Sequence, residues 1–182
     1  MNVTRCDIPG LLILQPKVFG DSRGYFVETW NRRRYEEIGL GADFVQDNLS
    51  FSSQGILRGL HFQNPNPQGK LLQVLQGEVY DVAVDLRRSS PTFGSWHAVL
   101  LSSENKLQFF IPVGFAHGFQ VTSPSALFHY KCDAFYSPKD EAALAWDDPQ
   151  LSIPWPIPTP SLSAKDAKGM RLSDIPEELL FP

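Results

Sequence analysis

The stretch that decides the fold is Gly77-Glu78-Val79-Tyr80-Asp81-Val82-Ala83-Val84-Asp85-Leu86-Arg87. The even-numbered residues 80 to 86 are apolar and fall on one face of an extended chain, while Asp81 and Asp85 fall on the other face with Val79 and Ala83. A period of two is the spacing of a β-strand. The stretch therefore predicts a strand with apolar side chains on both faces.

Short segments of the same character recur along the chain, and turn-forming residues separate them at short intervals, as at Asn64-Pro65-Asn66-Pro67. Many short strands with frequent turns favour a sandwich or jelly-roll barrel, and the lack of helical segments between them disfavours a parallel α/β fold. Further strands are predicted at Leu11–Gln15, Tyr25–Trp30, Phe44–Phe51, Ile56–Phe62, Lys70–Leu75, His97–Leu101, Lys106–Ile111, Gly118–Val121 and Leu127–Phe135.

Helical signals are few. One short helix is predicted at Asn31–Ile38, where Asn31 can cap the first turn and Gly39 can end the segment. The proline-rich stretch 154–160 predicts an extended connector, and Ser163 can cap a turn that reaches Asp166. We expect one domain over residues 1–182, with an extended or helical tail from about residue 150.

Composition limits the function classes. With 42% apolar and 20% charged residues the chain is close to the globular average, which excludes a disordered or fibrous protein. The net charge is −4, and the one basic run, Arg32–Arg34, precedes two glutamates and fits a solvated helix face better than a nucleic-acid site. No stretch of about 18 apolar residues occurs. Cys6 and Cys132 form no paired motif and suit a reducing compartment. We expect a cytoplasmic protein without a nucleic-acid or membrane partner.

The histidines differ in their surroundings. His97 and His129 lie in alternating strand segments and are interpreted as structural. Strand parity puts His61 on one face with Leu57, Gly59 and Gln63, while Arg58, Leu60 and Phe62 lie on the other. Gly59 beside His61 is expected to leave room for a ligand.

His117 ends the pattern Pro112-x-Gly114-x-x-His117, which resembles the second motif of the cupin jelly rolls. A metal-binding cupin needs His-x-His in its first motif, and His61-Phe62-Gln63 lacks the second histidine. We therefore predict no metal, and no other cofactor.

Several ordered blocks resemble the dTDP-4-dehydrorhamnose 3,5-epimerase family, over about residues 9 to 167. The resemblance implies a cupin-type jelly-roll barrel. The blocks are Pro16–Gly24, Phe44–Asn48, Gly55–Gln63, Gln68–Leu71, Gly77–Arg87, Ser90–Gly94, Ile111–Phe119, Tyr130-Lys131, Trp146–Pro149 and Leu162–Ala167.

The resemblance implies roles for four side chains. His61 resembles the base that removes a proton, and Asp166 the carboxylate that pairs with it. Tyr130 resembles the acid on the opposite face, and Lys70 the cation that stabilises an enolate oxygen. On the residues alone, structural roles explain these side chains equally well. Asp166 could be a capping carboxylate, Tyr130 an aromatic side chain in a barrel strand, and Lys70 a solvated residue at the end of a strand.

The resemblance also implies substrate-binding residues, which match family positions that line the nucleotide-sugar site. These residues are Arg23, Glu28, Gln46, Asp47, Asn48, Arg58, His117, Glu141 and Lys165. The Arg side chains among them suit bidentate contact with a diphosphate. In the family the segment that carries Arg23 and Glu28 reaches a neighbouring subunit, which implies a homodimer. Phe135-Tyr136 departs from the family's usual two tyrosines, and Cys132 occupies a variable position, so both affect fine substrate preference.

The resemblance implies epimerisation at C3 and C5 of dTDP-4-dehydro-6-deoxy-D-glucose to dTDP-4-dehydro-L-rhamnose, in dTDP-L-rhamnose biosynthesis. A single-carbon epimerase of a related 4-keto-6-deoxysugar is the main alternative, because it keeps the same base and acid. A metal-dependent cupin oxygenase is disfavoured by the missing histidine. A non-catalytic sugar-binding cupin is disfavoured by the joint presence of His61, Lys70, Tyr130 and Asp166.

Overall fold

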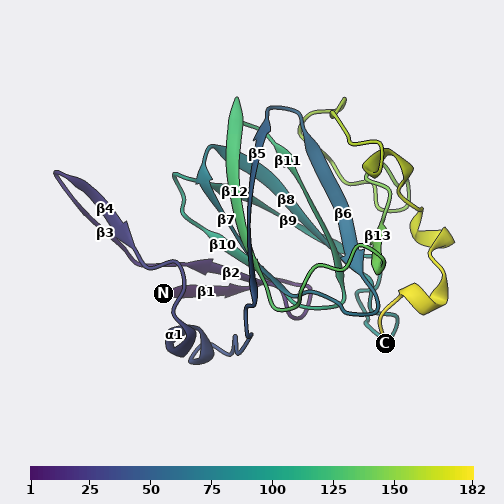
Figure 1. The fold of residues 1–182 in the computed structure, drawn as a ribbon, viewed down its shortest axis with the longest axis horizontal. Helices are drawn as coiled ribbons and strands as arrows, with labels where there is room; N and C mark the ends of the chain where they lie inside the picture. The colour runs from purple at the N-terminus through teal and green to yellow at the C-terminus, as the bar shows by residue number, and fades with distance from the viewer.

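Two antiparallel sheets face each other in the computed structural model, which describes residues 1–182 (Figure 1). The six-stranded sheet has the order β1 (Asn2–Arg5), β2 (Leu12–Gln15), β10 (Gln108–Ile111), β7 (Lys70–Gln76), β12 (Ser125–Cys132) and β5 (Gln46–Ser53). The five-stranded sheet has the order β13 (Glu141–Ala143), β6 (Leu57–Gln63), β11 (Phe115–Val121), β8 (Glu78–Asp85) and β9 (Trp96–Ser102). The predicted all-β, cupin-type jelly roll is confirmed.

The remaining elements lie outside the two sheets. β3 (Val18–Asp21) and β4 (Gly24–Val27) form a hairpin that extends away from the body, and α1 (Arg32–Glu36) lies beside β1 and β2 (Figure 1). Three 3₁₀ turns follow in the C-terminal segment, at Asp166–Lys168, Leu172–Asp174 and Glu177–Leu179. No helix in the structure is both long enough and apolar enough to cross a membrane.

Apolar side chains form three packed layers, so several strands are buried on both faces. The central layer lies between the sheets and includes Val79 and Ala83 of β8. Val82 and Val84 of the same strand belong to a second layer, which the C-terminal segment covers. The third layer lies between α1 and the six-stranded sheet. The alternation predicted for residues 78–86 is thus confirmed, and each face of the strand packs in a different apolar layer.

Most predicted strands occur, with boundaries shifted by one to three residues. The strand predicted at Tyr25–Trp30 stops at Val27, and the one predicted to reach Phe135 stops at Cys132. β1, β3 and β13 were not predicted, and none of these short strands contains a buried residue. The short helix begins after Asn31, whose side chain accepts a hydrogen bond from Arg34 N.

The predicted parity of β6 is wrong. His117 pairs with His61, whereas Phe119 pairs with Arg58, so three steps on β6 match two on β11. This β-bulge turns Arg58 and His61 to the same face of the strand. Gly59 has φ +119, and a Cβ atom there would lie 2.5 Å from Gly118 Cα. The missing side chain therefore admits the backbone of β11, not a ligand.

Candidate active site

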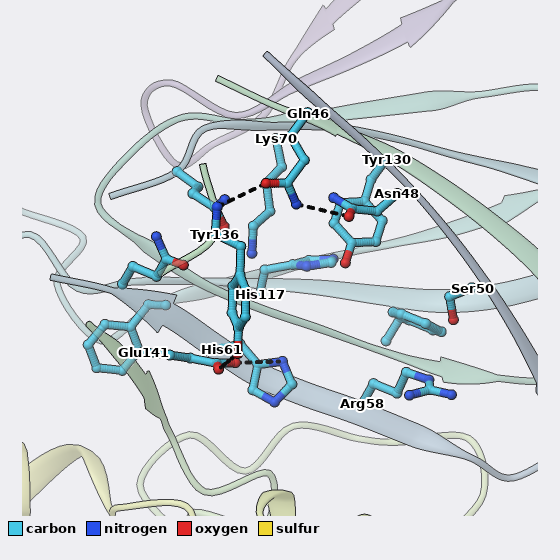
Figure 2. Close-up of a pocket in the computed structure, with 14 residues that line it drawn as sticks. Gln46, Asn48, Ser50, Arg58, His61, Lys70, His117, Tyr130, Tyr136 and Glu141 are labelled. Atoms are coloured by element: carbon cyan, nitrogen blue, oxygen red, sulfur yellow. Dashed lines mark hydrogen bonds and ion pairs between the residues drawn. The ribbon is translucent and has the colours of Figure 1, made fainter. Parts of the chain in front are cut away.

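A polar pocket of about 330 Å³ opens between the two sheets, with side chains entering it from both (Figure 2). The bulge in β6 brings Arg58 and His61 into it together, at the end of the barrel that β13 also reaches. The pocket is lined by Gln46, Asn48, Ser50, Arg58, His61, Phe62, Gln63, Gln68, Lys70, His117, Phe119, Tyr130, Tyr136 and Glu141.

His61 is held by a carboxylate from the C-terminal segment. Its Nε2 lies 2.5 Å from Asp166 Oδ1, and the Asp166 side chain is almost fully buried. Ser163 Oγ accepts a hydrogen bond from Asp166 N at 3.1 Å, so the predicted cap exists while the carboxylate itself faces His61. Burial acts to raise the pKa of Asp166, but the contacts with His61, Ser163 and Lys165 together outweigh it and hold that pKa below its usual value.

A second carboxylate lies on the other side of the same imidazole. Glu141 Oε1 is 4.0 Å from His61 Nδ1, and its Oε2 accepts a hydrogen bond from the Tyr136 hydroxyl (Figure 2). The same oxygen also pairs with Lys165. Burial acts to raise the pKa of Glu141, and the contacts with Lys165 and Tyr136 lower it on balance. The hydrogen bond to Glu141 raises the pKa of Tyr136 to about 12. His61 therefore has carboxylates at both ring nitrogens.

His117 is the register partner of His61 on the neighbouring strand β11, but its side chain is held differently. Its Nε2 is 3.0 and 3.1 Å from the two oxygens of Asp81, a fully buried residue of β8. Burial lowers the pKa of His117, although the charge of Asp81 opposes that shift. The pair forms one rigid wall of the pocket.

Lys70 and Tyr130 reach the pocket without a hydrogen bond or ion pair to another side chain (Figure 2). Burial lowers the pKa of the Lys70 amine, and burial raises the pKa of the Tyr130 phenol. Lys70 enters from β7 and Tyr130 from β12, the neighbouring strand. A free cation and a free hydroxyl are thus available to a bound molecule.

Alternate residues of β5 give the pocket a polar edge. Gln46 Nε2 donates to Asn48 Oδ1 at 2.9 Å, and Asn48 donates to Cys132 Sγ at 3.6 Å. Further along the strand, Ser52 Oγ accepts a hydrogen bond from Arg58 Nε at 3.0 Å. Burial raises the pKa of the Cys132 thiol to about 11, so this cysteine lies in the wall as a neutral group.

Five of the predicted residues do not line the pocket. Asp166 and Lys165 pair with the lining residues His61 and Glu141, whereas the side chains of the other three form no hydrogen bond or ion pair with a lining residue. Asp47 alternates with Gln46 and Asn48, so its side chain lies on the outer face of β5, 2.8 Å from Lys131 Nζ. Arg23 lies in the turn of the β3–β4 hairpin, paired with Asp21 at 2.6 Å. Glu28 follows that hairpin and pairs with Arg34 at 2.9 Å.

Sequence reasoning missed several lining residues, and it missed Asp81, which pairs with the lining residue His117. Asp81 carried a signal, because a charged side chain stood on the apolar inner face of the strand 78–86. Ser50 carried one too, since it shares strand parity with Gln46 and Asn48. Tyr136 reaches the pocket from a loop, and no periodicity could place it. His97 and His129 do not line the pocket, and no three His, Cys, Asp or Glu side chains form a group suited to a metal ion.

The fold and the pocket define a jelly-roll protein with an acid–base site, in which a paired imidazole shares a cavity with a phenol and an amine. The family described as dTDP-4-dehydrorhamnose 3,5-epimerase matches residues 5–174. The chain belongs to this family, whose members are isomerases.

Individual relatives support the same assignment. A dTDP-4-dehydrorhamnose 3,5-epimerase of Shigella flexneri is 53% identical over 176 residues, 96% of this chain and 97% of the relative. A crystal structure of a 3,5-epimerase from Legionella pneumophila in complex with dTDP-4-keto-L-rhamnose is 52% identical, with a TM-score of 0.96, and covers 99% of this chain and 97% of its own. A crystal structure of a 3′-monoepimerase from Streptomyces bikiniensis in complex with dTDP-quinovose is 31% identical, with a TM-score of 0.86. The match covers 92% of this chain and 86% of the monoepimerase chain.

Proposed function

We propose that this chain epimerises C3 and C5 of dTDP-4-dehydro-6-deoxy-D-glucose, giving dTDP-4-dehydro-L-rhamnose for dTDP-L-rhamnose biosynthesis. The observation that carries the proposal is the His61–Asp166 pair at 2.5 Å, in a pocket that also holds an unpaired Lys70 and Tyr130. The family membership supplies the substrate class.

The chemistry begins at the C4 ketone, which acidifies the hydrogens on C3 and C5. In our proposal the His61 nitrogen that does not face Asp166 removes one of these protons, and Asp166 stabilises the imidazolium that forms. Glu141, near that second nitrogen, adds negative charge on the same side.

The negative charge then moves to the C4 oxygen. Lys70 is our candidate for holding this enolate oxygen, since its amine has no carboxylate partner within the protein. Tyr130 is our candidate for returning a proton from the opposite face, which inverts the carbon. Proton exchange with solvent then returns His61 and Tyr130 to their starting states, and repeating the two transfers at the second carbon completes the double epimerisation.

The binding residues extend this pocket toward the nucleotide. We propose that Gln46, Asn48, His117 and Glu141 contact the sugar or nucleotide, and that Arg58 meets the diphosphate. Lys165 pairs with Glu141, and we assign it to the same binding surface. Asp47 is left out because its side chain lies on the other face of β5.

Proton exchange in deuterium oxide tests the reaction. The protein is incubated with dTDP-4-dehydro-6-deoxy-D-glucose in deuterium oxide, and NMR follows the label. Deuterium at both C3 and C5 is the expected result, whereas label at one carbon would establish a single-carbon epimerase. The likeness to a 3′-monoepimerase gives this second outcome a specific basis.

We also propose a homodimer in which each hairpin completes its neighbour's site. Phe19, Tyr25 and Phe26 on the hairpin are 51%, 59% and 67% exposed, more apolar surface than an isolated two-stranded ribbon keeps in water. On β5, Leu49 and Phe51 are also more than half exposed, on the outer face of the six-stranded sheet. A partner subunit would cover both surfaces.

Hybrid dimers test this arrangement. Arg23→Ala and His61→Ala variants are each expected to be nearly inactive, and mixing them after dissociation should restore about a quarter of wild-type activity. The restored site combines one chain's His61 with the other chain's Arg23. A monomeric mass by light scattering, or no recovery on mixing, would contradict the proposal.

The remaining assignments concern the chain as a whole. We propose that residues 1–182 work as one domain, because the segment after residue 150 supplies Trp155, Leu172 and Phe181 to the layer on the five-stranded sheet. We propose a cytoplasmic location, which suits two free cysteines. Fractionation of cells that express the protein would test the location.

A further inference from the structure

One buried hydroxyl in the pocket has no partner. Ser50 Oγ is shielded from solvent and makes no hydrogen bond, and it is the single buried side-chain nitrogen or oxygen of the chain in that condition. Buried polar atoms are nearly always hydrogen-bonded, because an unmet donor keeps the full cost of its desolvation. Ser50 lines the pocket, so a bound molecule can meet this hydroxyl.

The protein around Ser50 offers no acceptor. Ser50 stands opposite Phe128 in the register of β5 and β12, and the ring of Phe128 packs 4.2 Å from that of Phe119. On either side along β5, Asn48 is bonded to Gln46 and Cys132, and Ser52 is bonded to Arg58. The neighbouring polar groups of the strand are therefore already engaged, while Ser50 is not.

The position of Ser50 indicates which part of a substrate it meets. Ser50 lies between Asn48 and Ser52 on the same face of β5. Asn48 is the register partner of Tyr130, a proposed reacting group, whereas Ser52 is hydrogen-bonded to Arg58. Ser50 and Arg58 lie on the same side of the pocket, away from Glu141 (Figure 2). Arg58 uses Nε for Ser52 and has no acidic partner in the protein, so its terminal nitrogens are available to an anion.

We infer that the Ser50 hydroxyl donates a hydrogen bond to the sugar-linked phosphate of the nucleotide sugar, beside the Arg58 guanidinium. This inference rests on the proposed function, since it takes its ligand from the dTDP-sugar. In that arrangement Ser50 lies between the reacting ring and the guanidinium. It sets how far the sugar enters toward His61 and Tyr130.

Nucleotide binding by a Ser50→Ala variant tests the inference. Titration calorimetry compares dTDP, which carries the second phosphate, with dTMP, which lacks it. The variant should bind dTDP about tenfold more weakly, the loss expected for one hydrogen bond to a charged group, and bind dTMP as the wild type does. Thermal unfolding without ligand should give a melting temperature no lower than that of the wild type, because no internal hydrogen bond is lost.

Ser53→Ala is the matched control. Ser53 lies on the same strand, is exposed on its other face and makes no side-chain hydrogen bond, so its removal should leave dTDP affinity unchanged. Equal dTDP affinity in Ser50→Ala and wild type, an equal loss for dTMP, or a lowered melting temperature would overturn the inference. Wild-type protein that exchanges no substrate protons in deuterium oxide would overturn the proposed function as well, which separates the two failures.

Discussion

Two histidine–aspartate pairs lie side by side in one wall of the pocket, and they are built differently. His61 and His117 are register partners on the neighbouring strands β6 and β11. The His61 side chain is 29% exposed and that of His117 is 8% exposed. Asp166 approaches His61 with one oxygen at 2.5 Å, whereas Asp81 spans His117 Nε2 with both oxygens at about 3 Å. The same two residue types therefore give an accessible pair and an enclosed one.

The difference follows from where each carboxylate originates. Asp81 lies on β8, the strand next to His117, so the sheet itself fixes that pair. Asp166 comes from a 3₁₀ turn 105 residues after His61, and it approaches from the rim. The opposite side of the His61 ring remains open to the pocket, with Glu141 beside it. An accessible imidazole can gain and release a proton, while the enclosed one is suited to holding the wall in place.

The largest expected effect distinguishes the two imidazoles. His61→Asn should lower kcat by about 10² to 10⁴-fold, because the proposed general base is lost. His117→Asn should lower the free energy of unfolding by about 1 to 3 kcal/mol, because Asp81 stays buried without its partner. Deuterium exchange rates and urea denaturation measure the two quantities. Substantial exchange by His61→Asn would remove the basis for treating the pairs differently.

The two carboxylates provide a smaller contrast. Asp166→Asn keeps the shape of the side chain but removes the charge that favours the imidazolium, so kcat should fall about tenfold to a hundredfold with KM nearly unchanged. Asp81→Asn should act mainly on stability, since an amide there places an NH₂ group in a fully buried site. If Asp81→Asn lowered kcat more than Asp166→Asn at equal stability, the assignment of roles would have to be reversed.

Much of the fold could be predicted because its information is local. The alternation at residues 78–86 places each side chain of β8 on its correct face, and the Asn31 cap locates α1. The bulge in β6 could not be predicted from parity. It depends on the close approach of Gly59 to Gly118, a contact between strands that a single segment does not encode.

The site shows the same boundary between local and tertiary information. Strand parity alone puts Asp47 on the opposite face of the strand from Gln46 and Asn48, and it puts Ser50 on their face. A strict use of this pattern would therefore have removed Asp47 from the predicted binding residues and added Ser50. The approach of Asp166 to His61 depends on the return of the chain after 105 residues. Without the family resemblance, the cap at Ser163 would have been the better explanation for that carboxylate.

The smallest expected effect concerns the pH dependence of stability. Burial lowers the pKa of His117 in the folded protein, with His61 and Lys70 adding to the shift and Asp81 opposing it. Below the ordinary histidine pKa of about 6.5 the unfolded chain therefore binds a proton that folded His117 does not, so stability falls as the pH drops below that value.

One such proton contributes a slope of at most about 1.4 kcal/mol per pH unit. Urea denaturation of His117→Gln between pH 7 and pH 5 should give a shallower loss of stability than the wild type. Burial also lowers the pKa values of His97 and His129, so part of the slope should persist in the variant. A slope equal to that of the wild type would contradict the prediction.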